Sequence, residues 1–102
     1  MNPFILSPDA WEDTWLIWQN LAEISAPAVA DRIESELFSA FETLARVPGL
    51  GHLRPDLTSH QVYFWAVYQY MIVYRKSDPL EIVAVIHGKR DIQALLGKRQ
   101  IH

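Results

Sequence analysis

The sequence contains no cysteine, no internal repeat and no stretch typical of a secretory signal. Without cysteine, the 102-residue chain has no disulfide framework, thiol nucleophile or cysteine-ligated zinc site. The start Met1–Phe4 lacks the charged and apolar regions of a secretory signal. We therefore expect a cytoplasmic protein that holds no metal and needs no cofactor.

A long hydrophobic run is also missing. The longest stretch without Asp, Glu, Lys or Arg covers residues 57–74, which is long enough to be compared with a membrane span. Polar side chains interrupt it, among them Thr58, Gln61 and Gln69, and its β-branched and aromatic residues favour paired strands. We therefore expect no membrane partner.

Basic residues are in the minority, with 9 Lys and Arg against 12 Asp and Glu, for a formal net charge of -3. Residues 1–74 carry 3 basic and 9 acidic side chains, whereas residues 75–102 carry 6 basic and 3 acidic ones. An anionic partner is therefore expected at the C-terminal quarter. The acidic body is atypical of RNA or ribosome binders, and no sequence-specific nucleic-acid binding is expected. The length predicts one domain over residues 1–102 with one core.

Two long helices are predicted in the first half of the chain. Ser7 followed by Pro8 gives an N-cap and a proline in the first turn, so a helix is expected over residues 8–24. The segment Ser25 to Pro27 repeats this pattern, and a second amphipathic helix follows that ends before Pro48. The connection is short, which favours an antiparallel helical hairpin.

The second half of the chain alternates apolar and polar residues, as strands do. Strands are predicted over residues 61–67, 70–76 and 80–87, with an edge strand at 4–6, an irregular loop at 49–59 and a last helix at 92–96. The predicted fold class is α+β. It has an N-terminal strand, an antiparallel helix hairpin packed on one face of a largely antiparallel sheet of three or four strands, and a short C-terminal helix.

The first predicted helix has more apolar surface than one docking face needs. One stripe is formed by Trp11, Trp15, Trp18 and Ala22, and an adjoining one by Ala10, Ile17, Leu21 and Ile24. Asp13 is expected on the opposite side, with the other polar residues. Three tryptophans within two turns suit core packing or a partner interface equally well, because Trp serves both.

Candidate binding residues gather near the C-terminus. Arg75, Lys89 and Arg90 suit either solvated charges at strand ends or a binding role. A lone His87 favours a structural role over a general base, since no other histidine or carboxylate lies at metal or triad spacing. Lys98 and Arg99 are expected in a frayed tail. Most of the aromatic residues between 63 and 74 are expected in the core or in cross-strand pairs.

Several short motifs, which follow one another in a characteristic order along the sequence, link these elements to a known family. They are Leu6-Ser7-Pro8 and Ala10 at the first helix, Leu44-Ala45 with Pro48 and Gly51 at the exit of the second, Tyr70-Met71-Ile72-Val73-Tyr74-Arg75 on a strand, and Ile82 with Val85-Ile86-His87-Gly88-Lys89-Arg90-Asp91 at the end. Over residues 4–96 this order resembles the ParE/RelE superfamily of toxins from bacterial toxin-antitoxin pairs. The His-Gly-x-Arg-Asp form after the last strand resembles the ParE branch.

The resemblance implies a toxin that a cognate, ParD-like antitoxin neutralises, and two possible activities. RelE-like members cut mRNA on the ribosome, whereas ParE-like members act on DNA gyrase. RelE-like enzymes place an arginine just after the first tyrosine of the Tyr-x-x-x-Tyr pattern, where this chain has Met71. They place a functional tyrosine near the C-terminus, where this chain has Leu95 or Leu96. The ParE-like activity, inhibition of gyrase by binding, is therefore favoured.

On this basis no catalytic residue is assigned. The predicted target-binding residues are Arg75, His87, Lys89 and Arg90, and the predicted antitoxin-binding residues are Trp11, Trp15 and Trp18. Two alternatives remain open. One is a ribosome-dependent endoribonuclease that uses the same four target-binding residues for catalysis. The other is an inactivated toxin that retains only antitoxin binding.

Overall fold

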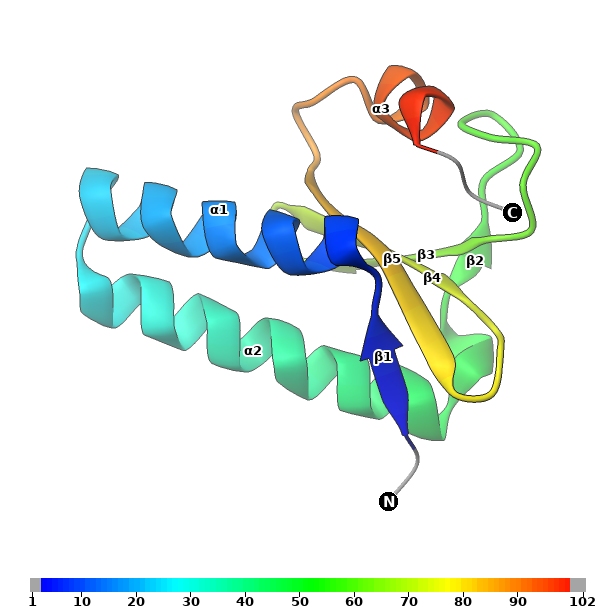
Figure 1. The fold of residues 1–102 in the computed structure, drawn as a ribbon, viewed down its shortest axis with the longest axis horizontal. Coiled ribbons are helices and arrows are strands. Elements are labelled where there is room, and N and C mark those ends of the chain that lie inside the picture. Colours follow the sequence, from blue (N-terminus) through cyan, green and yellow to red (C-terminus); the bar gives the residue numbers. More distant parts are fainter. Residues whose placement is uncertain (1–2, 100–102) are drawn as a thin grey trace.

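The computed structural model describes residues 3–99 of the chain (Figure 1). Its elements are β1 (Phe4–Leu6), α1 (Pro8–Ile24), α2 (Pro27–Arg46), the 3-10 turn η1 (Pro48–Leu50), β2 (His52–Leu53), β3 (Tyr63–Val67), β4 (Tyr70–Arg75), β5 (Leu80–His87) and α3 (Ile92–Lys98). The predicted α+β class is confirmed. No helix within residues 3–99 is long and apolar enough to cross a membrane.

The helix boundaries follow from local capping. The Ser7 hydroxyl accepts a hydrogen bond from the Ala10 amide at 3.1 Å, as expected of an N-cap, and α1 begins at Pro8. The second cap differs from the expectation. Ala26 precedes α2 without a side-chain hydrogen bond, and Ser25 ends α1 instead. The first-turn proline alone marks the start of α2, because its fixed φ suits that position.

The sheet has five strands in the order β1-β5-β4-β3-β2. The pair of β1 and β5 is parallel and the other pairs are antiparallel. The helical hairpin therefore carries the chain from β1 at one edge of the sheet to β2 at the other edge. The fifth strand is β2, two residues within the segment expected to be an irregular loop. Helix α3 continues through Gly97 to Lys98, beyond the predicted end at Leu96.

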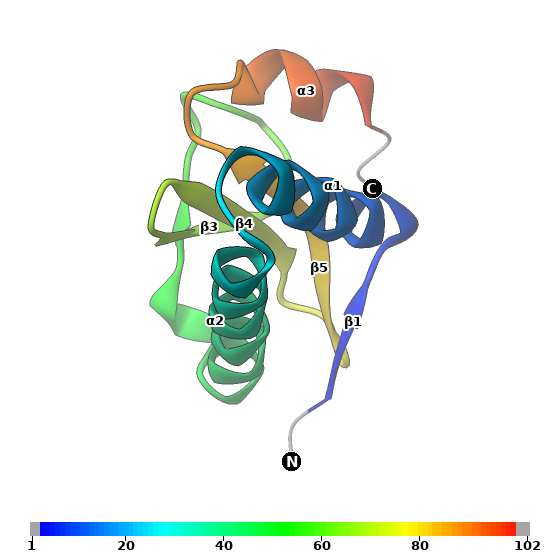
Figure 2. The ribbon, with the colours of Figure 1, turned by 90° about the vertical axis from the view of Figure 1, so that its left-hand side faces the viewer.

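Both faces of the sheet are covered. On one face, Tyr70, Ile72 and Ile82 pack with the apolar stripes of α1 and α2. On the other face, a second cluster includes Val73 and Ile86 together with side chains of α3. Figure 2 shows α1 and α2 side by side and α3 apart from them at the top of the view. The expected single core is therefore two clusters, one on each side of the sheet.

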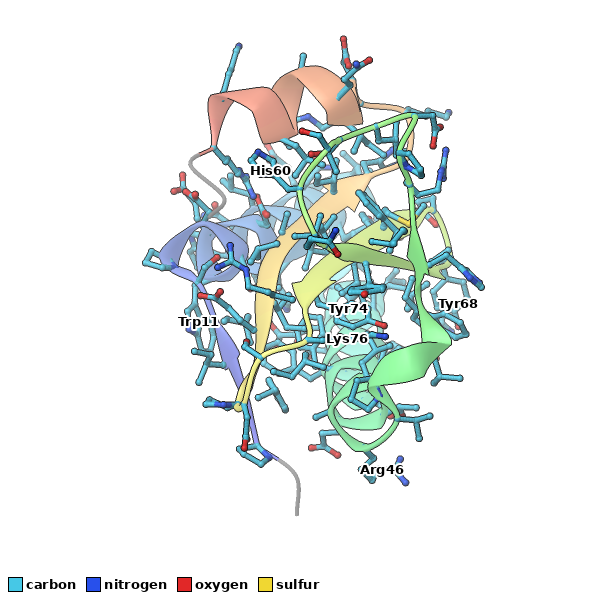
Figure 3. The ribbon with its side chains drawn as sticks, turned by 90° about the vertical axis from the view of Figure 1, so that its right-hand side faces the viewer. Trp11, Arg46, His60, Tyr68, Tyr74 and Lys76 are labelled. Atoms are coloured by element: carbon cyan, nitrogen blue, oxygen red, sulfur yellow. The ribbon has the colours of Figure 1, made fainter. Side chains whose placement is uncertain are left out.

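Tyr74 fixes the segment that joins the helices to the sheet (Figure 3). Its buried hydroxyl donates a hydrogen bond to the Pro48 carbonyl at 2.6 Å and accepts one from the Gly51 amide at 2.9 Å. Burial raises the pKa of the Tyr74 phenol. A Cβ atom at position 51 would lie 2.5 Å from this hydroxyl oxygen, so only glycine fits without a shift. This tyrosine of the family pattern has a structural role.

Candidate functional surfaces

The outer side of α1 exposes two of its three tryptophans. Trp11 and Trp15 are each 56% exposed, and the Trp11 ring is tilted by 47° against that of Phe38 of α2, with 5.9 Å between centroids. Trp18 is half-buried, and its Nε1 donates a hydrogen bond to Asp31 Oδ1 at 2.9 Å. The parallel rings of Trp15 and Trp18 lie 6.2 Å apart. Trp18 therefore joins the two helices, whereas Trp11 and Trp15 are available to a partner.

Two further apolar side chains of α1 are exposed. Leu16 is 51% and Ile24 is 69% exposed. The buried residues of α1 are Ala10, Asp13, Thr14 and Leu21. Ile17, Trp18 and Ala22 also pack partly against the core, so the uncovered apolar surface of α1 is that of Trp11, Trp15, Leu16 and Ile24.

The prediction for Asp13 is wrong. Its side chain is buried on the core side of α1, because it lies three residues after Ala10 and four before Ile17. The carboxylate accepts a hydrogen bond from the Val85 amide at 2.9 Å. Strand β1 pairs with β5 only up to Ile82, so the edge of β5 is open beyond this point. The Asp13 carboxylate thus accepts the hydrogen bond from Val85 that a longer β1 would accept.

The prediction of a frayed tail is wrong for Arg99. Its guanidinium binds both oxygens of Asp13, at 2.7 and 2.8 Å, and its side chain is only 15% exposed. The hydrogen bond with Asp13 raises the pKa of Arg99 and outweighs the effect of burial. Eighty-six positions separate the two residues, so no sequence spacing could have revealed the pair. Lys98 is exposed.

The structure separates the four predicted target-binding residues into two places. His87 ends β5, and Lys89 and Arg90 follow in the exposed turn before α3. Arg75 pairs with Glu81 in the β4–β5 register, whereas His87 pairs with Tyr70 at the opposite end. The Arg75 Nε lies 3.7 Å from Glu81. Arg75 therefore does not belong to the surface formed by the other three.

His87 shapes the turn that carries Lys89 and Arg90. Its Nδ1 accepts a hydrogen bond from the Lys89 amide at 3.1 Å, and its carbonyl accepts one from the Arg90 amide at 3.0 Å. Its ring packs edge to face on Tyr70. The Nδ1 lone pair is therefore engaged and does not serve as a base.

Arg54 is a basic residue that the sequence analysis left in an irregular loop. Together with Arg90 and Gln93 it lines a surface cavity of about 370 Å³. Asp56 holds its guanidinium through two hydrogen bonds of 2.8 and 2.9 Å at an exposed site. Only the return of the loop beside the β5–α3 turn brings Arg54 near Arg90, and no local pattern signals this.

The two positions compared with RelE-like enzymes are apolar and packed. Met71 is half-buried against the second core cluster, where Leu95 also packs. Leu96 is 1% exposed. Among the described residues 3–99, no group of three or more His, Cys, Asp or Glu side chains could hold a metal ion.

Comparisons with known proteins agree with this architecture. A chain of a solved structure described as the chromosomal ParDE TA system from P. aeruginosa is similar in fold, with a TM-score of 0.72 and 17% sequence identity. The match covers 85% of this chain and 96% of that one. No curated protein matches the sequence.

The chain is thus a small α+β protein that shares its fold with a chain of that ParDE system. A family model described as the ParE toxin of the type II toxin-antitoxin system, parDE, matches residues 4–92. The chain belongs to the ParE toxin family.

Proposed function

We propose that this toxin inhibits DNA gyrase by binding it, and that a cognate ParD-like antitoxin neutralises the toxin. Membership of the ParE family supports a toxin of a type II system. The observation that carries binding over catalysis is the apolar packing of Met71, Leu95 and Leu96, where an RNA-cleaving relative needs polar groups.

Metal-free RNA cleavage needs a base for the 2′-hydroxyl, positive charge on the phosphorane and an acid for the leaving oxygen. The candidate set for that chemistry is not assembled here. The His87 Nδ1 is occupied by a backbone amide, and Arg75 lies at the other end of the β4–β5 pair. Lys89 and Arg90 remain as exposed charges, which suit binding to an acidic surface.

The proposed target surface is the β5–α3 turn with His87, Lys89 and Arg90. Lys89 and Arg90 give this turn two exposed positive charges in a net-acidic protein, and such charges attract an anionic partner. Arg54 extends the same surface from the loop beside it. Gyrase bound to DNA offers such an anionic partner.

The proposed antitoxin surface is the outer face of α1 around Trp11 and Trp15. Two half-exposed tryptophans on one helix offer a large apolar area, and tryptophan is a frequent anchor of protein interfaces. Trp18 supports this surface indirectly, because its hydrogen bond to Asp31 fixes α1 to α2.

Induced expression, with and without the neighbouring gene, tests this function. We expect growth arrest with gyrase-cleaved DNA, and relief when the neighbouring gene is expressed as well. Ribosome-positioned mRNA cuts without gyrase-cleaved DNA would favour the endoribonuclease. A stable complex with the neighbour's product but no growth arrest would identify an inactivated toxin.

A further inference from the structure

We propose that the antitoxin segment on the outer face of α1 is a basic amphipathic one. Its apolar side chains cover Trp11 and Trp15, and its Lys and Arg side chains face the carboxylates beside them. This inference rests on the proposed antitoxin surface and specifies the chemistry of the partner that fits it.

The helical hairpin that holds the exposed tryptophans is strongly acidic. Helix α1 contains four acidic residues, Asp9, Glu12, Asp13 and Glu23, and no Lys, Arg or His. Residues 8–46 carry 8 acidic and 2 basic side chains, which gives -6, whereas the whole chain carries -3. The apolar face therefore lies within the most acidic part of the molecule.

The two arginines of the hairpin do not neutralise this face. Arg32 precedes Glu36 by four residues, so the two side chains lie on one side of α2. The hydrogen bond with Glu36 raises the pKa of the Tyr68 phenol, and the charge of Arg32 acts in the opposite direction. Arg46 lies in the last turn of α2, where its guanidinium contacts Thr43. Figure 3 shows Arg46 at the end of α2, away from Trp11. The arginines of the hairpin therefore do not lie beside the exposed tryptophans of α1.

The carboxylates nearest the exposed tryptophans are accessible. Glu12 precedes Trp15 by three residues, a spacing that makes side chains neighbours on a helix. Glu12 and Glu23 fall on the same side of α1, because about three turns separate them. Both side chains are exposed. A partner helix along the tryptophans would therefore pass within reach of both acids.

Arg99 shows how α1 binds a cation. Its guanidinium forms the two hydrogen bonds to Asp13, and its Nε lies 4.0 Å from Asp9. The charges of Asp9 and Glu12 also contribute to the raised pKa of Arg99. Arg99 therefore offsets one of the four negative charges of α1, and the helix with Arg99 keeps a net charge of -3. Exposed tryptophan rings attract cations as well.

A second copy of the chain fits this face poorly. Two copies docked through it would bring two hairpins of charge -6 together, and like charges across an interface are unfavourable. A basic partner is attracted by the acidic hairpin, whereas a second copy is repelled by it. The charge of the hairpin thus selects the basic segment as the occupant.

The test measures binding of the antitoxin encoded by the neighbouring gene to Glu12→Lys and Glu23→Lys variants. Asp78→Lys is the matched control, since it makes the same charge change at an exposed turn between β4 and β5. We expect each α1 variant to weaken the complex about fivefold or more at low salt, and the control to change it by less than about twofold. The difference should shrink at high salt, because salt screens exposed charges.

Three results would overturn the inference, and they differ in what they say about the proposed function. Loss of binding in Trp15→Ala, with Glu12→Lys and Glu23→Lys like the control, would reject the basic segment and keep the antitoxin surface. Absence of any complex with the wild-type chain would reject both. A homodimer of the wild-type chain that Trp15→Ala dissociates would assign the face to a second copy.

Discussion

Trp15 is the residue on which the proposed antitoxin surface most depends. It is half-exposed and stacked on Trp18, so its ring is held in one orientation before a partner arrives. We expect Trp15→Ala to weaken the complex with the antitoxin by about 2 kcal/mol, roughly thirtyfold. Isothermal titration calorimetry measures this change.

The matched control is Tyr68→Ala. Tyr68 is also a largely exposed aromatic residue, but it lies in the β3–β4 turn. We expect this variant to bind the antitoxin like the wild-type chain. Equal losses in both variants would show that exposed aromatic area in general, and not the α1 face, determines binding.

Gly51 offers a test of packing at a single atom. A Cβ atom there would meet the Tyr74 side chain at 2.5 and 2.7 Å and the Phe64 carbonyl oxygen at 2.9 Å. We expect Gly51→Ala to lower the free energy of unfolding by about 1–3 kcal/mol, the usual cost of an overpacked site. Gly49→Ala is the control, because nothing lies within 4 Å of its Cβ position. Denaturant unfolding compares the two, and equal stabilities would contradict the role given to Tyr74.

At the scale of elements, the Asp13–Arg99 pair connects α1, β5 and the end of α3. Removing Arg99 leaves a largely buried carboxylate with the Val85 amide as its remaining partner. We expect Arg99→Met to lower the free energy of unfolding by about 3 kcal/mol, and Lys98→Met to leave it nearly unchanged. Lys98 is the exposed neighbour of Arg99, so Lys98→Met shows the effect of replacing a basic side chain with methionine without breaking the Asp13–Arg99 pair.

A double-mutant cycle gives the interaction itself. We expect Asp13→Asn combined with Arg99→Met to be less destabilising than the sum of the two single changes, since the uncompensated charge is then removed. Strictly additive losses would show that the two side chains act independently.

The elements that sequence predicts well are those with local causes. The cap at Ser7, the proline at the start of α1 and the β-branched and aromatic runs of β4 and β5 are local signals, and their helix and strands appear where expected. The short β2 was missed, because two residues give no period and only pairing with β3 defines them.

The site shows the same division. The exposure of Trp11 and Trp15 follows from a helix with more apolar surface than its core uses. The burial of Asp13 and the separation of Arg75 from His87 depend on strand register and on contacts across the whole chain. Helix periodicity places Asp13 beside Ala10 and Ile17, but it contains no information about the Val85 amide and the Arg99 guanidinium that make burial of the carboxylate possible.

At the scale of the molecule, the two proposed binding surfaces differ in the sign of their charge. The acidic hairpin carries the proposed antitoxin face, and the basic β5–α3 turn carries the proposed target face. We expect Lys89→Glu with Arg90→Glu to abolish toxicity and to leave folding and antitoxin binding intact, because exposed charges contribute little to stability.

The control is the equal charge change at the other end of β4, Arg75→Glu with Lys76→Glu. Arg75 pairs with Glu81, and Lys76 lies over the Tyr63 ring at 4.1 Å, so neither contacts the turn. Growth assays after induction compare the two. Equal loss of toxicity in both would assign the effect to net charge instead of to the β5–α3 turn.

The central claim is that this toxin acts by binding gyrase and not by cutting RNA. Its most direct test adds the purified chain to purified gyrase with supercoilable DNA, and in parallel to ribosomes translating an mRNA. We expect gyrase activity to fall, to recover when the antitoxin is added, and to be unaffected by the Lys89→Glu, Arg90→Glu variant, while the mRNA stays intact. Ribosome-positioned mRNA cuts with gyrase fully active would contradict the claim.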